Sequence, residues 1–263
     1  MKIIPVLVMP LFLFAKVHYA KVEPYETVTL KSSVSGLVID ADLDLEGKVV
    51  KSKRIIHIDD ALDISSLKES KQSLVLLKEM LDLNEEIATT LKHSMHRQES
   101  YFKRISKLAT ASKTQKDNAF SAFSSAKSQY LSTREKIISL KKQMIDIQSK
   151  IDKLEDTVAK KSIVLKDRYL YKLLVRKGDF VAPGTPMARV DNISRAKLVL
   201  FLGEEELENI ALKSIYIDEK KSTYKIDKIW KVADEKFISL YRAEVIIPAP
   251  RDIFSKLIKV EIK

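Results

Sequence analysis

The feature that most constrains the fold is a long internal stretch without glycine or proline, from Lys48 to Lys177. The whole chain of 263 residues holds 5 glycines and 7 prolines, and all of them lie outside this stretch. A compact domain with ordinary loops rarely lacks both residue types over so many positions. The sequence therefore predicts a long helical insertion between two smaller parts of the chain.

Two runs of heptad spacing fill this stretch. The seam of the first run consists of Leu67, Leu74, Leu81, Ala88, Met95, Phe102 and Ala109, alternating with Ser70, Leu77, Asn84, Leu91, Gln98 and Ile105. The seam of the second run consists of Phe123, Tyr130, Ile137, Met144, Ile151 and Val158, alternating with Ala126, Thr133, Leu140, Ile147 and Leu154. Such spacing is typical of coiled coils, and we expect the polar members Asn84 and Gln98 to weaken the seam locally.

The two runs have nearly equal length, covering residues 63–108 and 113–161. Two equal arms joined by a few residues predict an antiparallel hairpin, each arm about 70 Å long at about 1.5 Å per residue. A plain dimeric coiled-coil rod is the alternative, but it would need no reversal at 109–112.

Strand patterns flank the helical stretch on both sides. Val38 to Leu45 alternates apolar residues with aspartates, which predicts a strand before the turn at Gly47. After the helices, the segment "VRKGDFVAPGTPMARV" repeats the order strand, glycine turn, strand. We expect two halves of one small β-domain. From Lys197 onward a short acidic helix and several short strands predict a β-barrel, with Trp230 packed inside it.

The segments "VSGLV…EGKVV" and "VRKGDFVAPGTPMARV" resemble the two half-motifs of the lipoyl domain in periplasmic adaptor proteins, the membrane fusion proteins of the HlyD kind. Members of that family carry a helical hairpin between the two halves. The resemblance implies an α+β fold, in which a long antiparallel coiled-coil hairpin is inserted in a split lipoyl (biotinyl-like) β-domain and a small β-barrel follows. This sequence departs from the family pattern at Lys53 and at "KDRYLYKL", where glycines are usual.

The expected organisation follows from these patterns together. Four glycines are expected at structural turns of the lipoyl halves, namely Gly36, Gly47, Gly178 and Gly184. The expected parts are a signal peptide at 1–20, an N-terminal strand at 21–34, the first lipoyl half at 35–60, the hairpin at 61–162, the second lipoyl half at 163–191 and the barrel at 192–263.

The N-terminus indicates export. An apolar run from Ile3 to Ala15 is too short for a membrane span of about 20 residues but fits the core of a secretory signal. Cleavage after Ala20 is expected, with retention as an uncleaved anchor as the alternative; either puts the rest of the chain in the periplasm. The formal charge of +11 is spread along helices beside Glu and Asp, so nucleic acid is not expected as a partner.

The resemblance also implies a site at the hairpin end. Adaptors share there an Arg, a Leu four residues on and a Ser after the turn, and these groups engage a TolC-like outer-membrane channel. The matching residues are Arg104, Leu108 and Ser112, although Ser112 comes about three residues earlier than the family spacing. In the competing interpretation, Arg104 is ordinary helix surface and Ser112 is only a helix cap.

No catalytic set is present, so we expect no enzymatic activity, no cofactor and no metal. His93 and His96 are expected on the outer helix face and His57 in a packed strand. The resemblance implies an adaptor that links an inner-membrane transporter of the RND or ABC type to the channel and self-associates into a ring through lipoyl domains. A periplasmic coiled-coil scaffold without a transport role is the alternative. A lipoyl carrier is disfavoured, because helices replace the turn that would present its lysine.

Overall fold

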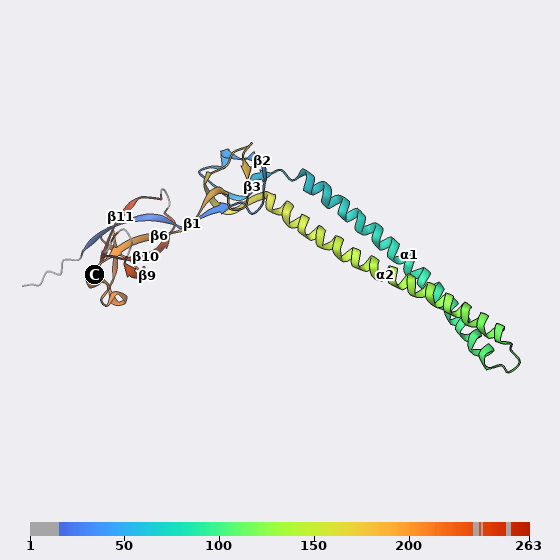
Figure 1. Cartoon of the computed structure of the whole chain (residues 1–263). Helices are drawn as coiled ribbons and strands as arrows, with labels where there is room; N and C mark the ends of the chain where they lie inside the picture. Colours follow the sequence, from blue (N-terminus) through green and yellow to red (C-terminus); the bar gives the residue numbers. More distant parts are fainter. Residues whose placement is uncertain (1–15, 234–236, 238, 251–253) are drawn as a thin grey trace, which may run out of the picture. The chain divides into compact units, whose positions relative to one another are not determined.

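The computed structural model describes residues 16–233, 237, 239–250 and 254–263. The chain has an α+β fold in which two long helices form a hairpin and the paired strands run mostly antiparallel (Figure 1). It divides into two compact units, one formed by His57–Ile163 and the other by Met1–Ile56 with Val164–Lys263. The leader expected at 1–20 falls largely on residues 1–15, which lie outside the described residues.

The hairpin consists of α1 (Ala61–Lys107) and α2 (Lys113–Lys161), and the predicted hairpin is confirmed. Every predicted seam residue from Leu67 to Ile105 and from Phe123 to Val158 is buried or half-buried. The two arms are also joined by ion pairs of 2.6 Å between Lys71 and Glu155 and 2.9 Å between Lys141 and Glu85. These pairs show the antiparallel register, because each step forward along α1 is matched by a step back along α2.

The other unit is built from strands. Their bounds are β1 (Val17–Lys31), β2 (Gly36–Ala41), β3 (Lys48–Ile58), β4 (Ser162–Leu173), β5 (Phe180–Val181), β6 (Pro186–Leu202), β7 (Ile215–Ile217), β8 (Lys220–Lys221), β9 (Ile226–Ala233), β10 (Tyr241–Pro248) and β11 (Leu257–Ile262). Three short helical segments accompany them: η1 (Leu43–Leu45), α3 (Glu204–Leu207) and η2 (Ile210–Leu212). The strand order is β5-β2-β3-β4-β6-β1-β11-β7-β8, and β10 joins both β6 and β9.

The long strands β1 and β6 each pair with different strands along different parts of their length. The start of β1, Val17–Lys21, pairs with β11, and the remainder of β1 pairs with β6. The first part of β6 pairs with β4, while residues 195–202 pair with β10. We call β2–β5 with the first part of β6 the split β module, and β7–β11 with the second part of β6 and the start of β1 the C-terminal β module.

Three of the four predicted glycine turns use a left-handed backbone. Gly47, Gly178 and Gly184 have φ of 74°, 97° and 92°, a region that side chains with a Cβ rarely enter. Gly36 differs, because it begins β2 and pairs with Val181 without a positive φ. At "KDRYLYKL", where the resembling family has a glycine turn, Asp167 takes φ of 48°. Asp is one of the residues that tolerate this region.

The strand predicted over Val38 to Leu45 is shorter than its alternation indicates. It ends at Ala41, and Leu43–Leu45 form a 3-10 turn. Lys53, the other departure from the family pattern, lies in β3 and forms a 2.7 Å ion pair with Asp42. The hydrogen bond to Asp42 raises the pKa of Lys53 above its ordinary value.

The C-terminal β module has its own apolar core. Its fully buried members come from β1, β6, β7, β10 and β11: Ala20, Val22, Ala196, Leu198, Leu200, Leu202, Ile215, Ala243, Val245 and Val260. Trp230 is not among them, which corrects the expected packing. Its side chain on β9 is 41% exposed, and the guanidinium of Arg242 lies 5.1 Å from its ring centre. Arg242 stacks on the ring as a cation–π partner.

Candidate partner-binding site at the hairpin tip

The tip is the turn 108–112 with the helix ends on either side of it. α1 ends at Lys107, and Leu108 takes an extended conformation while its N–H donates to the carbonyl of Ile105 at 3.2 Å. None of the turn residues has a positive φ. The chain therefore reverses with ordinary backbone conformations, which explains why no glycine is needed there.

Ser112 sets the start of α2. Its Oγ accepts a hydrogen bond from the N–H of Gln115 at 3.2 Å, and the Oε1 of Gln115 accepts from the N–H of Ser112 at 2.9 Å. This reciprocal pair is a capping box, which satisfies two donors at the helix start. The capping role expected for Ser112 is present. Gln115 was not singled out from the sequence, although a Ser followed three residues later by a Gln is the signal for such a box.

Arg104 and Leu108 are both exposed at the tip. The side chain of Leu108 is 50% exposed. The guanidinium of Arg104 makes no ion pair or side-chain hydrogen bond within the described part of the chain, although Lys103 beside it pairs with Glu99 at 2.6 Å. An unpaired guanidinium keeps its donors available for carboxylate or carbonyl acceptors.

An aromatic cluster packs between the two helices next to the turn. The ring of Phe102 on α1 lies 5.5 Å from that of Phe120 and 6.2 Å from that of Phe123, both on α2. Phe102 and Phe123 are predicted seam residues, whereas Phe120 was not predicted and is 54% exposed. Aromatic pairs at these separations stabilise packing beyond the area they bury. They hold the end of α1 against the start of α2, next to the turn.

The tip is basic. Between 103 and 117 the cations are Lys103, Arg104, Lys107, Lys113 and Lys116, and Asp117 is the one acid. Arg104 and Lys107 lie in the last turn of α1, where cations favour the helix dipole. Lys113 and Lys116 lie at the start of α2, whose first turn has no acidic residue, so there the dipole disfavours them. The tip is thus suited to an acceptor-rich partner surface.

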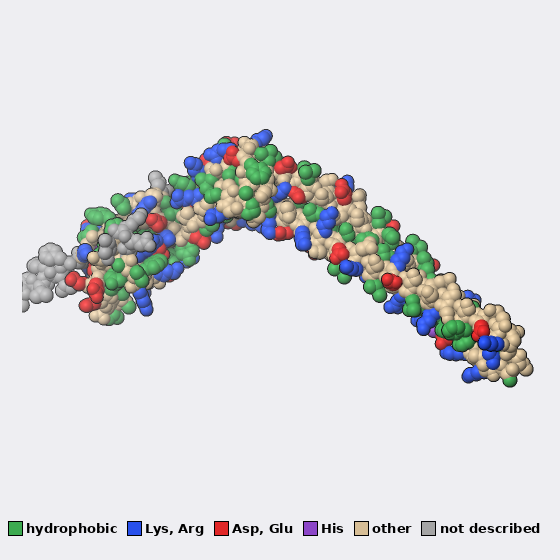
Figure 2. Space-filling model, in the orientation of Figure 1, with side chains coloured by type: hydrophobic (Ala, Val, Ile, Leu, Met, Phe, Trp, Pro, Cys, Tyr) green, Lys and Arg blue, Asp and Glu red, His purple; other side chains and the backbone are tan. Residues whose placement is uncertain are grey.

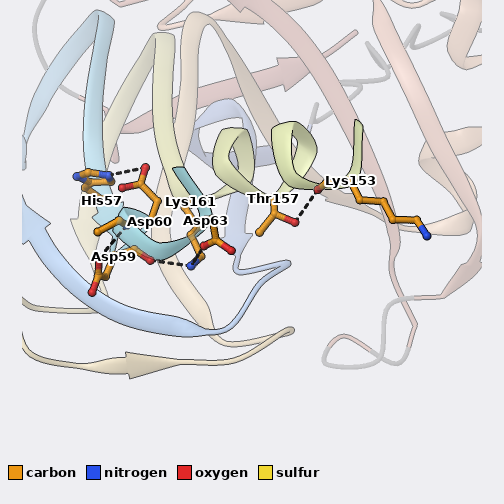
Figure 3. Close-up of polar contacts among 8 residues, drawn as sticks. His57, Asp59, Asp60, Asp63, Lys153, Thr157 and Lys161 are labelled. Carbon is orange, nitrogen blue, oxygen red and sulfur yellow. Dashed lines mark hydrogen bonds and ion pairs between the residues drawn. The ribbon is translucent and has the colours of Figure 1, made fainter. Parts of the chain in front are cut away.

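The base of the hairpin is closed by a polar network (Figure 3). Lys161, at the end of α2, donates to the carbonyl oxygen of Asp59 at 2.6 Å and to the carboxylate of Asp63. His57 lies 3.1 Å from the carboxylate of Asp60. The side chain of His57 is 17% exposed, so it is largely packed, as expected, but it also has a polar partner.

The remaining histidines form no centre. His93 and His96 are exposed on α1, as expected, and His96 lies 3.4 Å from Glu99. Among the described residues, no group of three or more His, Asp or Glu side chains is placed to hold a metal ion. None of the helices in the described ranges is both long and apolar enough to span a membrane.

Comparisons with known proteins bear on the fold. No protein-family model matches the sequence, and no curated protein matches it significantly. Solved structures do match, and they are membrane fusion or periplasmic adaptor proteins. The chain therefore has the fold of membrane fusion proteins.

Three of these structures cover nearly the whole chain. MacA from Actinobacillus actinomycetemcomitans superposes with a TM-score of 0.72 at 15% identity, over 94% of this chain and 78% of that one. A MacA–MexA chimera containing the α-hairpin domain of Pseudomonas aeruginosa MexA gives 0.60 at 14% identity, over 94% and 80%. The membrane fusion protein Spr0693 from Streptococcus pneumoniae R6 gives 0.56 at 10% identity, over 95% and 99%.

Proposed function

We propose that the protein is a periplasmic adaptor of a tripartite efflux or type I-like secretion system. It would link an inner-membrane transporter of the RND or ABC type to a TolC-like outer-membrane channel. The observation that carries this proposal is the long hairpin with an exposed, capped tip, inserted in a strand-rich unit with the fold of membrane fusion proteins. The split β module corresponds to the proposed lipoyl domain, and the C-terminal β module to the proposed barrel.

The proposed role is mechanical and needs no catalysis or cofactor. The hairpin tip would dock on the channel through Arg104, Leu108 and Ser112, and several copies would associate into a ring. Arg104 supplies planar donors, Leu108 supplies an exposed apolar side chain, and Ser112 caps the helix that follows the turn. Export through the N-terminal leader, with cleavage or retention as an anchor, would place the chain in the periplasm.

The test is photo-crosslinking in cells from a photoreactive residue at position 108. We expect an adduct with an outer-membrane channel protein, identified by mass spectrometry. The same residue at Lys92, exposed on α1 away from the turn, is the matched control and should give no channel adduct. If position 108 gives no channel adduct, the proposed docking at the tip is wrong.

Charge reversal tests the same site by its effect on export. Arg104→Glu should sensitise cells to exported compounds as much as deletion of the gene does, while the amount of adaptor stays unchanged. Lys68→Glu, an exposed cation near the base of α1, is the control and should leave export intact. If export persists after Arg104, Leu108 and Ser112 are all replaced, the proposed docking through these three residues is wrong.

A further inference from the structure

Two lines of large apolar side chains lie exposed on the outside of the hairpin, away from its seam. The line on α1 consists of Leu76, Met80, Leu83 and Ile87, which are 59%, 45%, 59% and 46% exposed. The line on α2 consists of Leu131, Ile138 and Ile145, which are 53%, 63% and 69% exposed. We call them the α1 stripe and the α2 stripe. Figure 2 shows apolar side chains at the surface along the hairpin, with charged side chains between them.

Both stripes keep helical spacing. The α1 stripe advances by four, three and four residues, and the α2 stripe by seven and seven. Residues spaced in this way lie on one face of a helix, as the seam residues do. Single exposed apolar residues are normal on protein surfaces, but a contiguous apolar line such as the α1 stripe is typical of a contact surface. The members of the α2 stripe stand one heptad apart, about 10.5 Å along the helix, with charged side chains between them.

The stripes face nearly opposite directions. The ion pairs Lys71–Glu155 and Lys141–Glu85 lie along one side of the seam. Ile138 and Ile145 stand three residues before and four residues after Lys141, so the α2 stripe is on that side. Met80 and Ile87 directly precede the seam residues Leu81 and Ala88. The heptad position before these seam residues lies on the side of the seam opposite to the two ion pairs. One hairpin thus carries an apolar line on each of two opposing faces.

The stripes also lie at overlapping levels along the hairpin. Because Glu85 pairs with Lys141, Ile87 lies level with the residues around 139, close to Ile138. Leu83 lies correspondingly between Ile138 and Ile145. A second hairpin placed alongside in the same direction would therefore bring its α2 stripe level with the α1 stripe of the first.

The charges beside the two stripes are complementary. Glu79 and Glu86 border the α1 stripe at three- and four-residue spacing. The α2 stripe is bordered by four cations and one acid, namely Lys127, Arg134, Lys141, Lys142 and Glu135. Within the described part of the chain, Lys141 is the one member of these two sets that has an ion-pair partner. When two copies pack side by side, the acidic border of the α1 stripe of one copy would therefore face the basic border of the α2 stripe of the other.

We propose that the α1 stripe of one copy packs against the α2 stripe of the next, so that hairpins associate side by side and in the same direction. This inference rests on the self-association of the proposed adaptor and assigns it a surface on the hairpin. The contact is heterologous, since two different faces meet. Each copy keeps one stripe free for a further neighbour, and such contacts form a closed ring when the rotation between copies allows it.

Disulfide crosslinking between copies tests the contact, because the chain has no cysteine of its own. Cells would express one copy with Ile87→Cys and a second, differently tagged copy with Ile138→Cys. On oxidation we expect a disulfide dimer that carries both tags. Each variant expressed alone should give little dimer, because the α1 stripe meets the α2 stripe and not another α1 stripe. The control is Thr89→Cys, an exposed α1 residue off the stripe, combined with Ile138→Cys.

A charge exchange tests the bordering residues. Glu79→Lys with Glu86→Lys should lower the crosslinking yield at least several-fold, and Arg134→Glu with Lys142→Glu in the partner copy should restore it. Absence of the mixed dimer, or an equal yield from the Thr89 control, would overturn the proposed contact. If the contact fails while position 108 still crosslinks to the channel, the proposed function stands. If position 108 also gives no channel adduct, the proposed function fails with it.

Discussion

Lys161 donates a 2.6 Å hydrogen bond to the backbone carbonyl of Asp59, and so joins the last turn of α2 to the segment that leads into α1. The same ammonium group pairs with the carboxylate of Asp63 in the first turn of α1. Its side chain is only 12% exposed. The hairpin is therefore closed at its base by one partly buried cation.

Replacing this cation should loosen the base of the hairpin. Lys161→Met removes both contacts and leaves the partly buried carboxylate of Asp63 without its cation, which should cost about 1 kcal/mol or more of the free energy of unfolding. Chemical denaturation followed by helical circular dichroism measures the loss. The control is Lys160→Met, because Lys160 pairs only with the exposed Asp156 within the same helix and should cost about 0.5 kcal/mol or less. Equal losses for the two variants would contradict the role of Lys161.

Ser112 has a capping role that can be separated from its proposed contact with the channel. Ser112→Ala removes the cap and should lower stability by about 1 kcal/mol. Ser112→Asp keeps a capping oxygen and should restore stability. If Ser112 also touches the channel, Ser112→Asp will remain defective in export despite normal stability. Full export by Ser112→Asp would show that Ser112 acts as a cap alone.

Ser70 is a polar residue in the seam that the hairpin can lose without harm. It is 3% exposed, and no described group bonds to its Oγ. Ser70→Ala should raise the free energy of unfolding by about 1 kcal/mol, because a buried hydroxyl without a partner is costly. Asn84 is the contrast, since its amide donates to the carbonyl of Met80 at 2.6 Å. Greater stabilisation from Asn84→Ala than from Ser70→Ala would contradict this reasoning.

Glu206 makes the C-terminal β module sensitive to acid. Burial by itself raises the pKa of this carboxyl, but the N–H of Gly203 and the ring of His18, 2.6 Å away, outweigh it, so the pKa lies below its ordinary value of 4.5. A carboxylate with a lowered pKa stabilises the folded state above the unfolded-state pKa. That stability is lost as pH falls below about 4.5 and through the lowered pKa.

Thermal unfolding at a series of pH values tests this dependence. Glu206→Gln should be less stable than the parent near neutral pH, and the difference should shrink as the solution becomes acidic. Glu205→Gln, at an exposed neighbouring carboxylate, is the control and should follow the parent at every pH. A difference between parent and Glu206→Gln that does not change with pH would contradict the linkage.

The first residues of β1 lie inside the segment expected as a leader. Val17–Lys21 pair with β11, and Ala20 is fully buried in the core of the C-terminal β module. A chain that begins at Lys21, as cleavage after Ala20 would leave it, should be less stable than one that begins at Lys16, by about 1–3 kcal/mol. Denaturation of the two purified chains measures the difference, and equal stability would mean that these strand residues contribute little.

The hairpin could be predicted closely because its signal is local and repeated. Seam positions such as Leu67 and Ile137 recur at heptad spacing, and helical packing needs no information from distant residues. The end of β2 could not be predicted in the same way. The alternation continues to Leu45, yet the chain turns after Ala41, and the N–H of Gly47 donates to the carbonyl of Leu170. The turn is thus fixed by a residue far along the chain.

Part of the tip could also be predicted, because its signal is local. Ser112 carries a local capping signal, which the structure realises with Gln115. The exposure of Phe120 beside Phe102 depends on how two helices meet across the turn, and the heptad pattern alone does not define it. The outward-facing stripes do not follow from the seam pattern, because the heptad spacing of the seam defines only one face of each helix.

The unbroken helices make the hairpin a lever. α1 runs for 47 residues without the glycine or proline that would let it kink. At about 1.5 Å per residue it is about 70 Å long, so a rotation of about 5° at the base carries the tip sideways by about 6 Å, roughly the rise of one helical turn. A slight adjustment among His57, Asp59 and Lys161 would thus be magnified at Leu108 into a displacement of about the rise of one helical turn.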